Sequence, residues 1–196
     1  MNGTLNGAAA PARSSAAAIA DNVCPACNKL HPGTADGALR RLARTPQRLK
    51  RIVKGLDAKG FAATYGPGKW NVREILCHLR DCELMFGVRW RLMLSEEQPT
   101  LHSFDQDHWA SGARYAKQDG AAALATLVLL RSGNLEMVKL AGREALVRIG
   151  MHADYGAISI GQMARHLLAH DENHLAQLET ARGNWLAARK RRRVAR

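Results

Sequence analysis

The chain has 196 residues, of which 46% are hydrophobic and 23% are charged, as in an ordinary globular protein with a core of its own. It contains no run of about 18 apolar residues, so the composition predicts no membrane-spanning helix. The formal net charge of +12 at pH 7 draws attention to nucleic acids as partners, a possibility that depends on where the charge lies.

Residues 1–35 are rich in alanine, glycine, serine and proline and show no apolar periodicity. We expect them to form a flexible arm. The first 22 residues hold a single base, Arg13, and lack the leucine-rich segment of a secretory signal. The sequence therefore indicates a cytoplasmic protein.

The arm contains "CPACNKLH", which places Cys24 and Cys27 in a Cys-x-x-Cys pair close to His31. A zinc ribbon needs four ligands, and no second knuckle follows at the usual distance. Three interpretations stay open: a half-site completed by another chain, a metal-binding arm, or no function. The next cysteines, Cys77 and Cys82, are five residues apart and point to different helix faces, so they do not form a knuckle together.

Apolar side chains between Asp36 and Leu56 recur on one helical face. This predicts a first helix, stepped near Pro46 because proline is disfavoured in a helix interior. Seven bases lie between Arg40 and Lys54. A solvated basic face is the usual explanation for such a cluster.

Glycine and proline in "YGPGKW" break the pattern. Asn71 then caps a second helix that runs to about Leu94, with Glu74 three residues on as in a capping box. The connection that follows, residues 96–118, is too long for a tight antiparallel hairpin. We expect it to cross over the bundle or to line a site.

A third helix is predicted over about Gly120 to Leu140, followed by an irregular or hairpin-like segment over residues 143–159. Ser159 caps a fourth helix that we expect to end at Gly183. Strand signals are sparse, and internal repeats are absent from the sequence.

Four helices with at least one long connection predict an all-α four-helix bundle with crossover connections over residues 36–183. Residues 184–196 then form a basic tail, whose last ten residues carry six bases and no acid. A solvated tail accounts for this charge. The alternative is weak electrostatic binding to nucleic acid, which would fall steeply with salt.

Histidines mark the fourth helix. In "HLLAHDENHLAQLE" the residues His170 and His174 are one turn apart, so their Cβ atoms lie about 5–6 Å apart on one face. His166 continues the row, but three in-line residues on a straight helix are too spread for one ion. His78 lies among apolar residues of the second helix. These are either separate hydrogen-bonded histidines or ligands of one metal ion.

The segments "PGKWNVREILCHLRDCE", "FDQDHWA" and "HADYGAISIGQMARHLLAHDENHLAQLE" resemble, in this order, the DinB-like superfamily of metal-binding four-helix bundles. The resemblance covers about residues 36–182. It implies that His78, His170 and His174 bind a divalent metal ion, with His166 as a neighbour. It also implies crossover connections and, frequently, a homodimer.

Three neutral imidazoles leave an ion its full double charge and leave coordination positions open. Zinc, nickel and iron(II) all accept imidazole, so the identity of the metal stays open. The resemblance implies a metal-dependent hydrolase, or a transferase that uses a low-molecular-weight thiol, acting on a small molecule. The rival is a non-catalytic bundle that binds a metal or a ligand, so enzymatic activity is an open question.

Ligating histidines usually donate their second N–H to a carboxylate or a carbonyl. The candidate acids for this role are Asp171, Asp81 and Glu83, although each has the alternative of a solvated face. His152, at the entry to the fourth helix, is a further pocket candidate. In the crossover, Asp105, His108 and Trp109 either border the pocket or anchor a docked loop.

Overall fold

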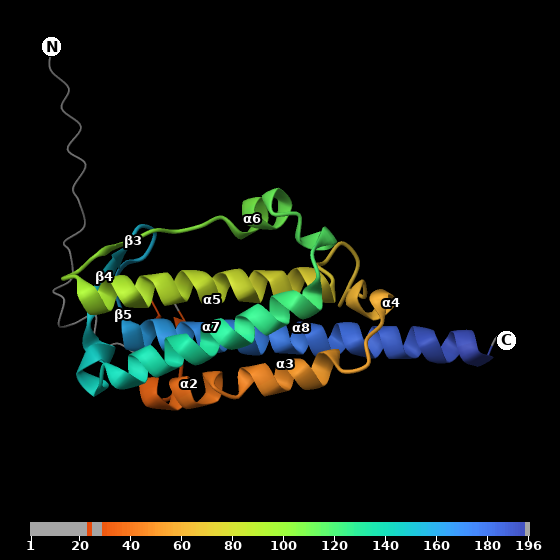
Figure 1. Cartoon of the computed structure of the whole chain (residues 1–196), viewed down its shortest axis with the longest axis horizontal. Coiled ribbons are helices and arrows are strands. Elements are labelled where there is room, and N and C mark those ends of the chain that lie inside the picture. The colour runs from red at the N-terminus through yellow and green to blue at the C-terminus, as the bar shows by residue number, and fades with distance from the viewer. Residues whose placement is uncertain (1–22, 25–28, 195–196) are drawn as a thin grey trace, which may run out of the picture.

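The computed structural model describes residues 23–24 and 29–194, and it is mostly helical (Figure 1). The main helices are α2 (Ala35–Leu42), α3 (Thr45–Val53), α5 (Val72–Ser95), α7 (Gly120–Leu140) and α8 (Ile160–Val194). The shorter ones are α4 (Ala58–Phe61), α6 (Gln106–Gly112) and the 3-10 turns η1 (Tyr115–Lys117) and η2 (Arg143–Val147). The strands are β1 (Val23–Cys24), β2 (Lys29–Leu30), β3 (Thr100–Leu101), β4 (Ile149–His152) and β5 (Gly156–Ser159).

The predicted step in the first helix is confirmed. α2 begins at the cap residue Thr34, whose side chain accepts a hydrogen bond from Gly37 N, and it ends at Leu42. Pro46 lies in the first turn of α3. At that position the missing N–H has no intrahelical partner to lose, so proline starts the new helix rather than breaking it.

Both predicted helix caps are present. Asn71 Oδ1 accepts from Glu74 N at 3.0 Å, and Glu74 Oε2 accepts from Asn71 N at 2.9 Å, which completes the capping box of α5. Ser159 and Gln162 make the same reciprocal pair at the start of α8. These two caps fix the beginnings of the helices that carry the histidines.

α5 and α7 run in the same direction, so the chain between them must return along the length of the bundle (Figure 1). This is the predicted crossover, and it contains β3, α6 and η1. β3 pairs in parallel with β4, and β4 pairs antiparallel with β5, which confirms the hairpin-like segment. A Cβ at Gly150 would lie 2.7 Å from Leu101 Cδ1, so glycine lets the crossover strand pack closely on the hairpin.

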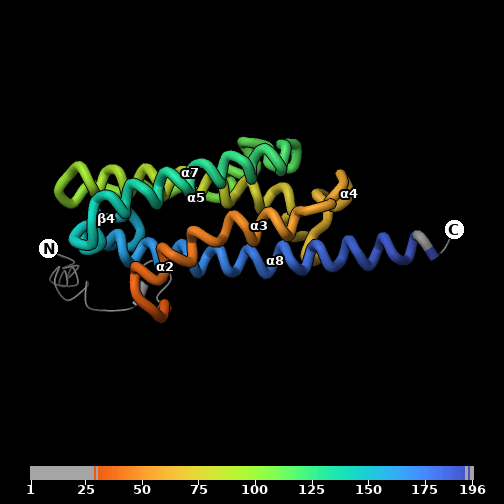
Figure 2. Tube along the Cα trace, turned by 60° about the horizontal axis from the view of Figure 1, so that its bottom comes forward, coloured from red at the N-terminus to blue at the C-terminus, as the bar shows by residue number. Residues whose placement is uncertain are grey.

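The four bundle elements are the α2–α3 pair, α5, α7 and α8. Figure 2 shows α2 and α3 beside α8, and α7 beside α5. Two groups of buried apolar side chains fill the space between them, one around Leu76 and Leu178 and the other around Trp90 and Leu167. The four-helix bundle predicted from the sequence is therefore the fold.

The prediction that the fourth helix ends at Gly183 is wrong, because α8 continues to Val194 and projects beyond the bundle (Figure 1). Trp185 is buried there, packs closely on Gly60 and donates from Nε1 to Asp57 Oδ1 at 3.1 Å. One glycine inside a helix costs only about 1 kcal/mol, which burial of a tryptophan offsets.

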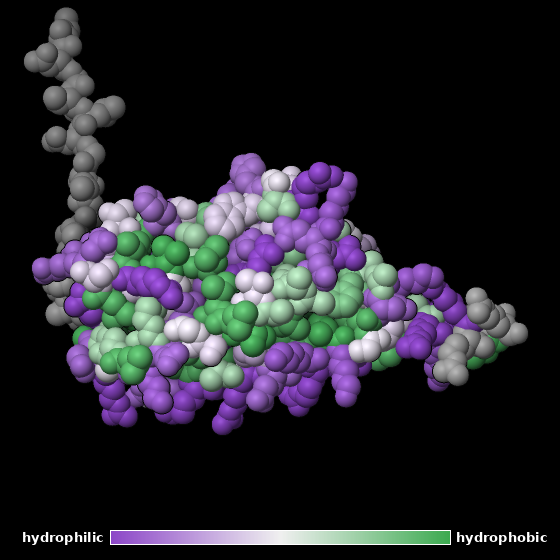
Figure 3. All heavy atoms as spheres, viewed as in Figure 1, coloured by the Kyte–Doolittle hydropathy of each residue, from purple (hydrophilic) through white to green (hydrophobic). Residues whose placement is uncertain are grey.

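Apolar side chains gather over α5 and α7 on the face shown in Figure 3. Leu84 and Val88 of α5 and Leu129 of α7 are exposed. By its length and composition, α7 is the one described helix that is long and apolar enough to cross a membrane, although a core helix passes the same test. The homodimer stays a prediction, and we expect its contact on this apolar face.

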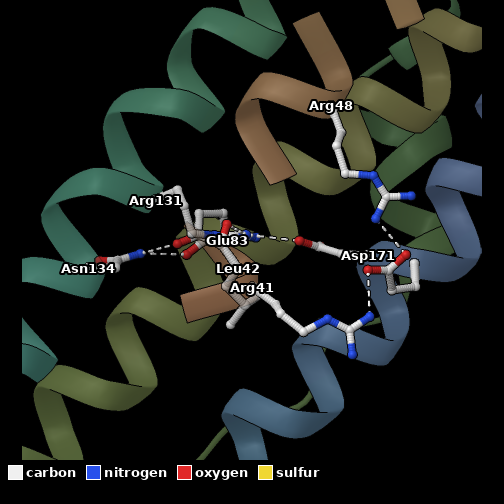
Figure 4. Close-up of polar contacts among 8 residues, drawn as sticks. Arg41, Leu42, Arg48, Glu83, Arg131, Asn134 and Asp171 are labelled. Carbon is white, nitrogen blue, oxygen red and sulfur yellow. Dashed lines mark hydrogen bonds and ion pairs between the residues drawn. The ribbon is translucent and has the colours of Figure 1, made fainter. Parts of the chain in front are cut away.

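A buried ion-pair network lies between the helices (Figure 4). Arg131 of α7, 2% exposed, contacts Glu83 of α5 through Nε at 2.7 Å and Asp171 of α8 through Nη1 at 2.8 Å. The same Nη1 donates to the Leu42 carbonyl oxygen at 3.1 Å, and Asn134 Nδ2 donates to Glu83 Oε1 at 2.8 Å. One guanidinium thus connects α2, α5, α7 and α8.

Replacing Arg131 with methionine is expected to lower the free energy of unfolding by about 3–5 kcal/mol, because two buried carboxylates would lose their cation. Urea unfolding followed by circular dichroism measures this loss. Arg48→Met is the matched control: Arg48 contacts Glu172 at the same 2.7 Å, but both side chains are 33% exposed. Its expected effect is below about 1 kcal/mol. Equal losses in the two variants would contradict the role of burial.

Candidate metal centre

Three histidine side chains converge between α5 and α8. Nε2 of His170 lies 2.9 Å from Nε2 of His78 and 3.2 Å from Nε2 of His174. Around a tetrahedral zinc ion with Zn–N bonds of 2.0–2.1 Å, the nitrogens are about 3.3 Å apart. Nε2 of His170 is therefore close to ligand spacing from each of the two other nitrogens predicted to share an ion with it.

The helices set this geometry. The α8 pair is one turn apart on a single face, and His78 comes from the second turn of the antiparallel helix α5. Nδ1 of His174 is 2.9 Å from Gln177 Oε1, an acceptor, so the proton resides on Nδ1 and the Nε2 lone pair is available to an ion. The Trp70 ring packs on His78 with centroids 5.0 Å apart.

Cys82 is a fourth donor that the sequence analysis missed. Its Sγ atom lies 3.5 Å from His78 Nε2 and 3.9 Å from His170 Nε2. Around one tetrahedral zinc ion, sulfur and nitrogen ligands would be about 3.6 Å apart. His78, Cys82 and His170 thus form a group whose ligand atoms lie within 4.8 Å of one another. The signal was the four-residue spacing of His78 and Cys82 on one helix.

Burial keeps the three imidazoles neutral. It lowers the pKa of His78 to about 3, with the nearby His174 as a second cause, and it lowers the pKa of His170 well below its usual value. Burial also lowers the pKa of His174, although the hydrogen bond that this histidine donates to Gln177 acts in the opposite direction. Neutral imidazole is the form that binds metal ions, so the chain presents its ligands ready for an ion.

The three acidic candidates have other partners. Glu83 and Asp171 pair with Arg131, as described above, and neither appears in a hydrogen bond with a described histidine. Asp81 accepts from Tyr115 Oη at 2.5 Å and pairs with Arg80 at 2.7 Å. The described contacts therefore do not include the expected hydrogen bonds between these acids and the histidines. Instead, Asp81 acts electrostatically to raise the pKa of His78, and Asp171 acts in the same way on His174, in both cases against the larger lowering by burial.

Nδ1 of His170 is the exception to the rule that a ligating histidine donates its second N–H. It is buried and has no hydrogen-bond partner in the described part of the chain. The carboxylate oxygen Oδ1 of the adjacent Asp171 is also buried without a partner there. The support for this imidazole therefore comes from packing between α5 and α8 rather than from a hydrogen bond.

A cavity of about 260 Å³ adjoins the centre. His78, Cys82 and His170 line it, as does the predicted pocket residue His152. His166 lines the cavity as well, with its ring stacked 6.2 Å from that of Phe86. His166 thus lies on the wall of the same cavity as His78 and His170, and its role as a neighbour of the metal ligands stays a prediction.

The crossover borders the cavity through Phe104, and not through the residues singled out in the sequence. Asp105 caps α6, and His108 beside it is 89% exposed. Trp109 packs on Phe104 with ring centroids 4.6 Å apart and lies against the core. Of the two alternatives offered by the sequence, these residues fit a loop that is docked on the bundle, and not a pocket border.

The proposed second metal group stays a prediction. Cys27 lies outside the described residues, as does the side chain of Cys24. His31 is described, and its ring is 6.0 Å from that of His166. Burial lowers the pKa of His31.

The buried histidines predict how stability depends on pH. Below pH 6.5 histidines protonate in the unfolded chain but stay neutral in the folded one, so stability is present above 6.5 and is lost as the pH falls towards 3. Each such histidine should contribute about 1.4 kcal/mol per pH unit in that window. We expect this slope in urea unfolding of metal-free protein between pH 7 and 5. His78→Gln should reduce it, whereas the exposed His108→Gln should not; an unchanged slope in His78→Gln would contradict the assignment.

Comparison with known proteins identifies the family. The profile of the DinB superfamily matches residues 41–178. The chain is 30% identical over 150 residues to "Putative metal-dependent hydrolase OB0413" of Oceanobacillus iheyensis, covering 74% of this chain and 84% of the relative. It is 25% identical over 143 residues to "Putative metal-dependent hydrolase BH0277" of Halalkalibacterium halodurans, covering 73% and 83%.

The solved structure of YfiT from Bacillus subtilis, described as a probable metal-dependent hydrolase with an unusual four-helix bundle topology, superposes with a TM-score of 0.72. The sequences are 22% identical, and the match covers 83% of this chain and 97% of YfiT, which confirms the bundle fold. The profile match and the relative at 30% identity also confirm the family resemblance seen in the sequence. The chain belongs to the DinB superfamily.

Proposed function

We propose that this protein is a metal-dependent hydrolase that acts on a small molecule. The observation that carries the proposal is that His170 Nε2 lies at ligand spacing from Nε2 of both His78 and His174, and that His78 and His170 line a cavity of about 260 Å³. The cavity is below the usual range for drug-sized ligands, about 300–1,000 Å³, and therefore favours a small substrate. The names of the relatives support the reaction type.

A divalent ion held by three neutral imidazoles keeps its double charge and would supply a Lewis acid that lowers the pKa of a water molecule or of a thiol. The chain's own residues hold the ligands in place. Gln177 fixes the proton of His174 on Nδ1, and Trp70 packs against the His78 ring. The described cavity wall contains no glutamate, and its one acid is Asp154.

Metal analysis of untagged protein is the first test. We expect about one divalent ion per chain in the wild type and in His108→Ala, whose histidine is exposed. His170→Ala should lose the ion, because its Nε2 lies within reach of both other nitrogens. Equal metal in wild type and His170→Ala would contradict the three-histidine site, and loss on changing Cys24 and Cys27 to serine would assign the metal to the arm instead.

Activity is then measured on the loaded protein with small esters and amides, with and without a low-molecular-weight thiol. Hydrolysis without thiol that is lost in His170→Ala supports the proposal. Turnover only with thiol would replace it with the thiol-dependent transferase, and metal binding with neither activity would leave the non-catalytic bundle.

Whether Cys82 binds the ion determines whether the centre keeps an open coordination position. Three histidines suffice for a catalytic zinc site, whereas a fourth protein ligand is typical of a closed structural one. We therefore expect Cys82→Ser to retain about one ion per chain, measured in the same metal analysis. Loss of the ion as complete as in His170→Ala would show that Cys82 closes the site, and this would contradict the hydrolase proposal.

A further inference from the structure

The cavity extends from the histidines to a buried arginine. Arg89 of α5 lines it and is only 6% exposed. Its Nε and Nη2 atoms donate to the His102 carbonyl oxygen, at 3.2 and 2.5 Å. The guanidinium carbon lies 5.8 Å from the Phe86 ring centroid and 5.9 Å from that of Phe104.

The charge of Arg89 lacks a close counterion. No ion pair joins it to a carboxylate among residues 23–24 and 29–194, whereas the other deeply buried arginine, Arg131, contacts two. Burying a cation is costly unless an anion accompanies it. Arg89 is thus held beside a cavity by one carbonyl and two aromatic rings, with its charge not matched by the described chain.

A second donor on the same cavity wall also lacks a partner. His152 is 5% exposed, and its Nδ1 accepts a hydrogen bond from Asp154 N at 3.2 Å. The ring proton therefore resides on Nε2. That atom is buried and has no hydrogen-bond partner in the described structure. The Tyr155 ring stacks on the imidazole with centroids 4.1 Å apart and keeps it in place.

A buried N–H without an acceptor and a buried cation without an anion are both unfavourable, and one ligand would satisfy both. We propose that Arg89 and His152 bind a carboxylate group of the substrate. The substrate class is then a small carboxylate whose apolar part lies against Phe86 and Phe104. This inference rests on the proposed function, because His78 and His170 line the same cavity.

The charge balance of the cavity favours a carboxylate over a phosphate. One arginine and one neutral imidazole supply a single positive charge. Asp154, whose side chain is 53% exposed, also lines the cavity and lies 4.0 Å from His152 Nδ1. Asp154 repels any anion in the cavity, and it repels a dianionic phosphate more strongly than a carboxylate with a single charge.

The experiment measures binding of benzoate to the metal-free full chain by isothermal titration calorimetry, so that a bound ion takes no part. Benzamide has the same shape without the charge, and inorganic phosphate is the competing anion. We expect benzoate to bind at least tenfold more tightly than either. Equal binding of benzamide, or tighter binding of phosphate, would overturn the proposal.

Variants assign the binding to the two donors. Arg89→Met and His152→Phe should each weaken benzoate binding at least tenfold. Arg91→Met is the matched control, since Arg91 lies on the same helix but contacts Gly87 O and Asn134 Oδ1 away from the cavity. It should bind benzoate as the wild type does. Wild-type affinity in Arg89→Met, or an equal loss in Arg91→Met, would overturn the proposal.

Thermal unfolding of each variant checks the fold, because Arg89 also supports the His102 carbonyl. If Arg89→Met is unfolded, Arg89→Lys takes its place, because lysine keeps the positive charge and one donor group. The loss of benzoate affinity in Arg89→Lys is then expected to be smaller than the loss in His152→Phe. Failure of the two proposals can be told apart. Benzoate binding without a metal-dependent activity sinks only the hydrolase, and activity without benzoate binding sinks only the carboxylate site.

Discussion

The arrangement of the bundle depends on the buried guanidinium of Arg131. Its two carboxylate partners come from α5 and α8, and each is the direct neighbour of a residue at the metal centre: Glu83 follows Cys82, and Asp171 follows His170. Because an unpaired buried charge is far more costly than a paired one, rotation of either helix is opposed. The ion pairs therefore hold the two ligand-bearing helices in register.

The interior contains two buried arginines, Arg131 and Arg89, whose surroundings differ. Around Arg131 both buried carboxylates contact the one guanidinium, and these ion pairs tie the helices together. Arg89 makes no ion pair in the described chain and contacts a carbonyl and two aromatic rings, with the half-exposed Asp154 on the same cavity wall, and we propose that this arginine binds an anion. His78 and His170 line the same cavity as Arg89, and their burial keeps them neutral for a metal ion. Structural support and ligand binding are thus assigned to different arginines of one interior.

Local signals were predictable because they act over a few residues. The capping pair of Asn71 and Glu74, the step at Pro46 and the helical spacing of His170 and His174 were all found in the sequence and all are present. The end of α8 was not, because the glycine signal at Gly183 is local whereas the burial of a tryptophan against α4 is not.

The sequence by itself determined the helices, their caps, the long crossover and, through the family pattern, the three histidines. Only the tertiary structure decided the partners of each polar group. It turned Glu83 and Asp171 towards Arg131, brought Cys82 to the histidines and placed His152 across a cavity from them. The physical reason is that helical periodicity states which residues share a face, while the partner across the interface depends on the rotation and register of helices far apart in the chain.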